Sequence, residues 1–260
     1  MRIFGKFAAT ALAGLIISIS FASVTAQIRK DVFQPGEELV YNVKYGFVKL
    51  GTVVIQTGGI SADGRASARL KFWTADVPFL DTKSTVTDVI DTKGLFLTQF
   101  TEKSQNGDNL TNKQMTYDLA SKSLNYSDDK IKNKITTGIE PFSDALTLVY
   151  NMRSWSGAAG KSYKFPLRGK DGEKTVTVKF TNDFSKEAVP ALDDKEVRTR
   201  ILQGQADMGS SSPLGANGAF TVYVSDDAAA IPVRIDMSIA VGSISLVLEK
   251  VKRIDWTAAK

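Results

Sequence analysis

The sequence predicts an all-β protein: a large, curved antiparallel sheet, half-open barrel or sandwich, with one packed helix at about residues 143–155. Two observations predict this fold. Apolar and polar residues alternate with a period of two in short segments along most of the chain, and glycine-containing turns separate these segments. Only one later stretch changes to helical spacing. Because a sheet of about a dozen or more strands must curl or split into layers, we expect a concave apolar face.

The segment 33–57 predicts the first hairpin, around which the remaining strands are arranged. Alternate residues of Leu39–Tyr45 are apolar, and a second apolar segment follows from Phe47 to Gln56. Pro35-Gly36 precedes the first strand as a turn, and Gly46 separates the two strands. Glu37, within this first turn, is predicted to accept backbone N–H groups and so fix the start of the sheet.

The middle of the chain contains the predicted helix. Leu146, Val149 and Arg153 fall at helical spacing. Ser143 is predicted to be the N-cap, and Asp144 suits the positive end of the helix dipole. Period-2 segments return from Lys161 onward. We interpret residues 27–260 as a single β-rich domain, since all-β domains of this length are common.

The first 26 residues have the pattern of a cleavable signal peptide. Arg2 and Lys6 form a positive start, residues 7–24 are apolar and uncharged, and Val24-Thr25-Ala26 supplies small residues before the expected cleavage site. An N-terminal membrane anchor is the alternative, because the apolar stretch is nearly long enough to cross a bilayer. Cleavage predicts a periplasmic protein without a transmembrane span.

The composition excludes several kinds of chemistry. Loss of Arg2 and Lys6 would lower the net charge from +5 to +3, and no run of cations suggests a nucleic-acid partner. The chain contains no histidine and no cysteine, which rules out Ser-His-Asp and Cys-His catalysis and ordinary zinc sites. No phosphate-binding glycine loop is present. We therefore expect no cofactor and no metal, and a non-enzymatic role is favoured over an enzymatic one.

Three blocks of sequence lie at residues 33–52, 143–153 and 224–248. Together they resemble the bacterial domain-of-unknown-function family 3108, whose members are exported proteins of the Gram-negative envelope. The resemblance covers roughly residues 32–251 and implies a β-rich fold and an envelope location, without an established activity. The residues that carry it, expected to be structural, are Pro35, Gly36, Glu37, Gly46, Gly51, Ser143, Asp144, Asp226, Asp227 and Pro232.

One group of residues is a candidate ligand-binding set on the concave face. Aromatic side chains at strand spacing either line a cavity or form ordinary core, and Arg153 either meets an anionic headgroup or pairs with an acid or the helix end. The candidates are Tyr41, Tyr45, Phe72, Trp73, Tyr150 and Arg153.

These features leave three functional hypotheses. The first is a periplasmic binding or carrier protein for a lipid or other apolar or amphipathic ligand. The second is a structural or scaffolding factor that contacts other envelope proteins through sheet edges or the segment Gly209–Gly218, which is rich in serine and glycine. The third, less favoured, is a carbohydrate-active enzyme that uses carboxylates such as Asp226.

Overall fold

The computed structural model describes residues 31–75, 81–156, 158–169, 172–206, 218–239, 242–254 and 256. The predicted signal peptide lies outside the described residues, as does the segment Gly209–Gly218 apart from its last residue.

The described residues form fourteen β-strands, one α-helix and a short 3-10 helix, which confirms the all-β prediction. The first eight strands are β1 (Glu38–Tyr45), β2 (Val48–Ile60), β3 (Arg65–Thr74), β4 (Thr82–Asp91), β5 (Phe96–Asn106), β6 (Asn109–Asp118), β7 (Ser123–Asp128) and β8 (Lys134–Thr136). The helix α1 (Ala145–Ser154) follows them. The remaining elements are β9 (Ser162–Gly169), β10 (Gly172–Val189), the 3-10 helix (Pro190–Leu192), β11 (Lys195–Ala206), β12 (Ala219–Ser225), β13 (Pro232–Ser238) and β14 (Ser243–Lys252).

All fourteen strands belong to one antiparallel sheet. Its order is β8-β7-β6-β5-β4-β3-β2-β1-β14-β13-β12-β11-β10-β9, so that two meanders meet where β1 pairs with β14. The two edge strands, β8 and β9, are therefore consecutive in sequence, and the connection between them carries α1. The sheet is open, because β8 and β9 do not pair with each other.

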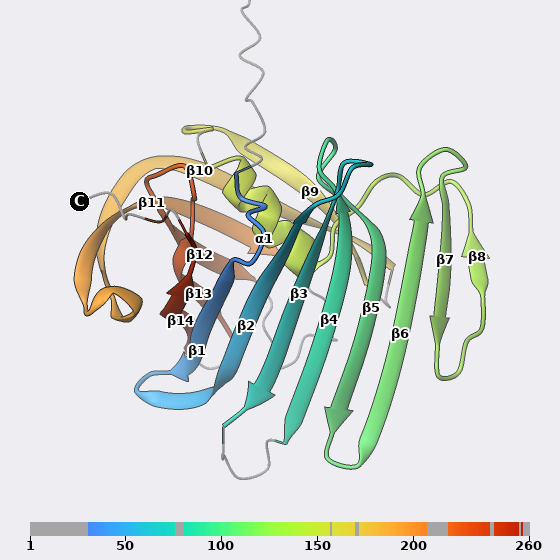
Figure 1. Ribbon diagram of the computed structural model, residues 1–260, viewed down its shortest axis with the longest axis horizontal. Helices are drawn as coiled ribbons and strands as arrows, with labels where there is room; N and C mark the ends of the chain where they lie inside the picture. Colours follow the sequence, from blue (N-terminus) through green and yellow to red (C-terminus); the bar gives the residue numbers. More distant parts are fainter. Residues whose placement is uncertain are drawn as a thin grey trace, which may run out of the picture.

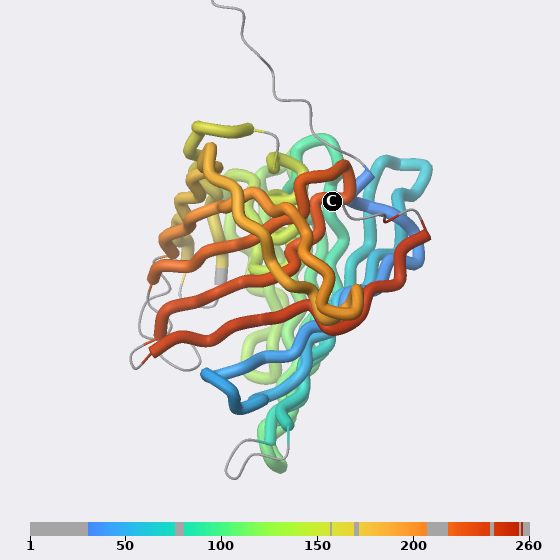
Figure 2. Tube along the Cα trace, turned by 90° about the vertical axis from the view of Figure 1, so that its left-hand side faces the viewer, coloured from blue at the N-terminus to red at the C-terminus, as the bar shows by residue number. Residues whose placement is uncertain are grey.

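The sheet curls around α1. Figure 1 shows β2–β6 as a layer on one side of the helix and β10–β14 on the other, and Figure 2 shows the second half from its own side. Opposite sides of the helix pack against the two halves of the sheet. Leu146 and Tyr150 pack in a core cluster built largely from β1–β4, whereas Leu148 and Met152 pack in a cluster built from β9–β12.

The predicted alternation is present in β1. Leu39, Tyr41 and Val43 are buried, while the residues between them are partly exposed. Since successive strand residues point to opposite faces, one face of β1 is committed to the core. Gly46 makes the turn into β2 with a positive φ of 57°, a conformation that glycine adopts without steric cost.

The segment just before α1 links the two halves of the sheet. The Leu97 N–H donates to the Phe142 carbonyl oxygen at 2.9 Å, which ties the segment to β5. Ser143 then exchanges backbone hydrogen bonds with β9: its N–H donates to Pro166 at 2.8 Å, and its carbonyl accepts from Arg168 at 3.0 Å. The helix therefore begins at a fixed position between the two halves.

Candidate ligand cavity

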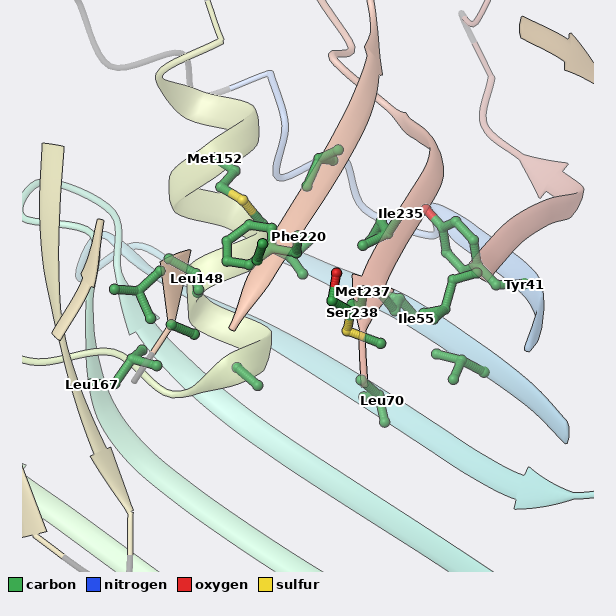
Figure 3. Close-up of a pocket in the computed structure, with 18 of the residues that line it drawn as sticks. Tyr41, Ile55, Leu70, Leu148, Met152, Leu167, Phe220, Ile235, Met237 and Ser238 are labelled. Carbon is green, nitrogen blue, oxygen red and sulfur yellow. The ribbon is translucent and has the colours of Figure 1, made fainter. Parts of the chain in front are cut away.

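An apolar cavity of about 240 Å³ lies between α1 and the curled sheet. Figure 3 shows helix residues Leu148 and Met152 on one side, with Phe220, Ile235 and Met237 from the C-terminal strands near them. The lining residues are Tyr41, Val53, Ile55, Leu70, Ala145, Leu148, Val149, Met152, Leu167, Val176, Ala206, Gly218, Ala219, Phe220, Val222, Ile235, Met237, Ser238 and Leu246. They come from both halves of the sheet, so the cavity exists only because the sheet curls.

The start of α1 is fixed by Asp144, which corrects the prediction that Ser143 is the N-cap. The Asp144 carboxylate accepts a hydrogen bond from the Thr147 N–H at 2.8 Å, and its backbone is extended. Ser143 is occupied elsewhere, since its backbone pairs with β9 and its hydroxyl oxygen accepts a hydrogen bond from Asn151 at 3.0 Å. Tertiary pairing of Ser143 therefore moves the cap by one residue.

The other end of α1 is held by a buried ion-pair cluster. Glu37, 1% exposed, accepts two hydrogen bonds from the guanidinium of Arg153, at 2.7 and 2.8 Å, and Arg153 is 0% exposed. A second arginine, Arg253, donates to the same carboxylate. Arg153 also donates to the Ala229 carbonyl at 3.1 Å. One carboxylate thus joins the first turn, the helix and the residue after β14.

This cluster corrects the prediction for Glu37 and selects one of the two alternatives for Arg153. Glu37 accepts hydrogen bonds from arginine side chains, and Arg153 is paired with an acid. Burial alone would raise the pKa of Glu37, but the charge and hydrogen bonds of Arg153, with those of Arg253, outweigh burial and lower it. Glu37 is therefore ionised at neutral pH.

Tyr150 extends the cluster on the helix. Its hydroxyl shares a 2.8 Å hydrogen bond with Thr57, whose own hydroxyl reaches Glu37 at 3.3 Å, and its ring stacks on Phe33 with centroids 4.9 Å apart. Burial is the main reason that the pKa of Tyr150 rises to about 12. The ring and hydroxyl are both engaged in packing the helix against the sheet.

A second buried carboxyl lies near the start of α1. Asp88 of β4 is 0% exposed and accepts a 3.1 Å hydrogen bond from the Thr147 hydroxyl. Burial raises the pKa of Asp88 well above its usual range, and the neighbouring charge of Asp144 raises it further. Asp88 therefore stays protonated to a higher pH than an exposed aspartate, and its protonated form is a neutral, hydrogen-bonded group beneath the helix.

Comparisons with known proteins assign the chain to a family. A family model described as "Protein of unknown function (DUF3108)" matches residues 40–249. The chain belongs to DUF3108. The match includes the residues that suggested the resemblance except Pro35, Gly36 and Glu37, which precede residue 40.

Among solved structures, the DUF3108 chain is similar to a β-barrel-like protein of the DUF1849 family from Brucella abortus. The two share 16% identity with a TM-score of 0.62, and the alignment covers 88% of this chain and 100% of the other. A Bacteroides fragilis protein with a YmcC-like fold aligns at 13% identity and a TM-score of 0.41, covering 85% and 97% of the two chains. A search of curated proteins found no match. These likenesses concern the fold alone.

Of the predicted ligand-binding residues, Tyr41 lines the cavity of this DUF3108 protein, with its hydroxyl donating to the Pro232 carbonyl at 2.9 Å. Arg153 and Tyr150 are buried in the Glu37 cluster. Phe72 packs half-buried on the core near the cavity, outside its wall. The remaining two, Tyr45 and Trp73, are each 39% exposed, Tyr45 at the end of β1 and Trp73 on β3.

The acidic pair Asp226-Asp227 has structural partners in the DUF3108 chain. Asp226 accepts a 2.6 Å hydrogen bond from Arg200 and lies 3.4 Å from the nearest guanidinium nitrogen of Arg198. Asp227 accepts from the backbone N–H groups of the turn before β13 and from the Trp256 indole at 3.0 Å. The two carboxylates therefore bind different partners. Across the described residues, no cluster of three or more potential ligand side chains could hold a metal ion.

Several motif residues have steric roles. A side chain at Gly51 would place its Cβ 2.5 Å from the Trp73 carbonyl oxygen, so the close pairing of β2 with β3 needs glycine. Pro35 lies against Gly59, where a Cβ would meet the proline ring at 2.6 Å. Gly36 adopts a positive φ of 77° in the turn before β1. Pro35, Gly36 and Gly51 therefore have structural roles around the first hairpin.

The sequence reasoning missed much of the cavity wall and two buried ionisable residues, Arg253 and Asp88. Met237, Phe220 and Leu148 are apolar residues in predicted elements, and only the curling of the sheet brings them together. Arg253 and Asp88 carry no local pattern that predicts a buried role. In the described ranges of the chain, no helix has the length and hydrophobicity needed to cross a membrane.

Proposed function

We propose that this protein is an exported, periplasmic, non-enzymatic binding or carrier protein for an apolar or amphipathic, lipid-like ligand. The observation that carries the proposal is the cavity beneath α1, whose described walls are almost wholly aliphatic or aromatic. Pockets with apolar walls bind apolar molecules. The periplasmic location follows from the predicted signal peptide and from the envelope location that the family resemblance implied.

The size of the cavity limits the ligand. Pockets for drug-sized ligands span roughly 300–1,000 Å³, and this cavity measures about 240 Å³. It therefore suits one acyl chain or a small apolar molecule better than a whole two-chain lipid. A polar headgroup, if present, would remain outside the apolar walls, because burying it without partners is costly.

The walls favour binding over catalysis. Tyr41 and Ser238 supply the hydroxyl side chains among the lining residues, and the Tyr41 hydroxyl is already bonded to Pro232. Burial also raises the pKa of Tyr41, which keeps its phenol neutral. Among the described lining residues, none is a carboxylate, lysine or arginine that could transfer a proton at neutral pH.

A cavity-filling variant tests the proposal. Ala145 lines the cavity from the exposed start of α1, so Ala145→Phe should fill part of the space while leaving the core intact. We expect it to weaken binding of dansyl-labelled undecanoic acid by about tenfold or more, measured by fluorescence titration. Ala62→Phe, in an exposed turn that does not line the cavity, is the matched control and should bind as the parent does.

Native mass spectrometry of the protein purified from its own periplasm provides the first measurement. A stoichiometric lipid or amphiphile, released on denaturation and identified by organic extraction, would support the proposal. A clean apo mass, from a preparation in which a control carrier keeps its lipid, would oppose it. Equal probe affinity in the Ala145→Phe variant and the parent would also oppose it, and the scaffolding hypothesis would then be preferred.

A further inference from the structure

The turn between β1 and β2 exposes a large apolar side chain. Phe47 is 97% exposed, and its neighbour Val48 is 42% exposed. Lys44 and Lys49 are register partners at the base of this turn. We call residues Lys44–Lys49 the hairpin tip. It has the composition of an element that inserts into a lipid interface, with an aromatic ring at its end and cations where headgroups would lie.

The outward face of β2–β5 continues this cationic surface. Val53, Ile55 and Leu70 line the cavity, so their sequence neighbours point to the opposite face of the sheet. Three successive cross-strand rows on that face contain four cations, one tryptophan and no carboxylate. The rows are Thr52–Trp73–Lys83–Gln105, Val54–Lys71–Thr85–Lys103 and Gln56–Arg69–Thr87–Thr101.

The charges of this surface are not neutralised within the described part of the chain. Lys44, Lys49, Lys71, Lys83 and Lys103 form no ion pair with any described residue.

Carboxylates lie at the borders of this surface. Glu38 of β1 accepts a 2.7 Å hydrogen bond from Gln56, at the end of the third row. Asp81 precedes β4, Asp108 is in the turn between β5 and β6, and Glu249 is bonded to Asn42 on the β14 side. The surface therefore has an unpaired positive charge that complements an anionic partner.

The hairpin tip lies near one end of the cavity. Tyr45, Ile244 and Met237 are register partners on β1, β14 and β13, and Met237 lines the cavity. Gly242, just before β14, also lies at this end, since a side chain there would contact the Tyr45 ring. An apolar molecule leaving this end of the cavity would meet whatever surface the hairpin tip contacts.

We propose that the protein docks on an anionic lipid bilayer through the hairpin tip, with Phe47 inserted among the lipids and Lys49, Lys83 and their neighbours at the headgroups. Trp73, on the same face, suits the interface because its indole combines an apolar ring with a polar N–H. Docking does not depend on an occupied cavity, so it extends the proposed function and can fail or succeed separately.

Flotation with lipid vesicles tests this inference. The chain beginning at Gln27 contains every described residue and lacks the apolar leader, which would bind lipid by itself. We expect it to float with vesicles of phosphatidylcholine and phosphatidylglycerol, more weakly with phosphatidylcholine alone, and less as salt is raised. Phe47→Ser should weaken the binding by about tenfold, the loss expected when one aromatic ring no longer inserts.

Charge reversal provides a second test of binding to vesicles. Lys49→Glu with Lys83→Glu should weaken binding to the anionic vesicles by at least about tenfold. Each variant has a control elsewhere on the protein. Ile254→Ser replaces an apolar side chain that is 87% exposed after β14, and Lys161→Glu with Lys164→Glu reverses two charges at β9. Both controls should bind like the parent, and so should the cavity-filling Ala145→Phe variant.

Three outcomes would overturn the inference. They are no flotation with anionic vesicles, equal losses in the variants and their controls, and binding to soluble polyphosphate without binding to vesicles. The last result would assign the cationic face to a polyanion. Since Phe47, Lys49 and Lys83 are exposed, these substitutions leave the core unchanged and the flotation result can be interpreted directly.

Discussion

At the scale of single residues, Glu37 has the most connections to distant parts of the chain. It accepts hydrogen bonds from Arg153, on the helix, and from Arg253, beyond the last strand. A buried ion pair contributes little against an apolar replacement, but removal of one partner leaves buried charge without compensation. The two arginines share a single carboxylate, so its loss affects both.

We therefore expect Glu37→Gln to destabilise the fold by about 3–5 kcal/mol. Urea unfolding followed by circular dichroism would measure the loss. Glu37→Gln combined with Arg153→Met should cost less than the sum of the two single changes, because the second removes a charge that the first leaves unpaired. Strict additivity in this double-mutant cycle would contradict the proposed role.

At the scale of elements, β11 and β12 show how a small residue shapes the cavity. Gly204 and Phe220 are register partners, and a Cβ at Gly204 would lie 1.8 Å from the Phe220 ring. The ring therefore covers the glycine and presents its other side to the cavity. The absence of a side chain at Gly204 determines where Phe220 lies.

Gly204→Ala should push the Phe220 ring away from β11, cost about 1–3 kcal/mol in stability, and reduce affinity for the dansyl-labelled fatty acid. The urea midpoint and the fluorescence titration would report the two effects. Adding Phe220→Leu should recover most of the lost stability, since the smaller side chain relieves the overlap. A failure of the second change to recover stability would argue against the contact as the cause.

At the scale of the whole molecule, two buried carboxyls give the stability opposite dependences on pH. Asp88 has a folded pKa raised above the unfolded value of about 3.9, so stability falls as pH rises from that value through the folded pKa. Glu37 has a lowered folded pKa, so its contribution is present above the unfolded value of about 4.3 and is lost as pH falls through the folded pKa.

Asp88→Asn should remove the loss of stability that Asp88 causes as pH rises. The amide keeps the shape and hydrogen bonds of a protonated carboxyl without an ionisable proton, so the variant should be more stable than the parent at pH 7 and no more stable near pH 4. Urea unfolding at the two pH values measures the difference. A gain of equal size at both values would show that ionisation of Asp88 is not the cause.

Much of the architecture could be predicted from the sequence because local patterns are repeated in the final fold. The alternation in Leu39–Tyr45 predicted a strand with one buried face, and Gly46 predicted the turn after it. The helix was placed correctly, but its cap was predicted one residue early, because backbone pairing of Ser143 with β9 is a long-range interaction.

The candidate site was less predictable for a related reason. Tyr41 was identified as a candidate because an aromatic residue on the inner face of a strand suits a cavity wall. Phe220 and Met237 have equally suitable patterns, but nothing in their neighbourhoods distinguishes wall from core. The partner that Glu37 would find was also unpredictable, since Arg153 and Arg253 are 116 and 216 residues away.

Most strands, the turns, helix α1 and the family could be predicted from the sequence, because each depends on neighbouring residues or on a pattern read along the chain. Three features became visible only in the folded chain: the two meanders join through β1 and β14, α1 lies inside the curl, and a cavity remains beneath it. The physical reason is that these features result from burying apolar faces of distant strands against one helix, and the free energy of that burial depends on the whole arrangement.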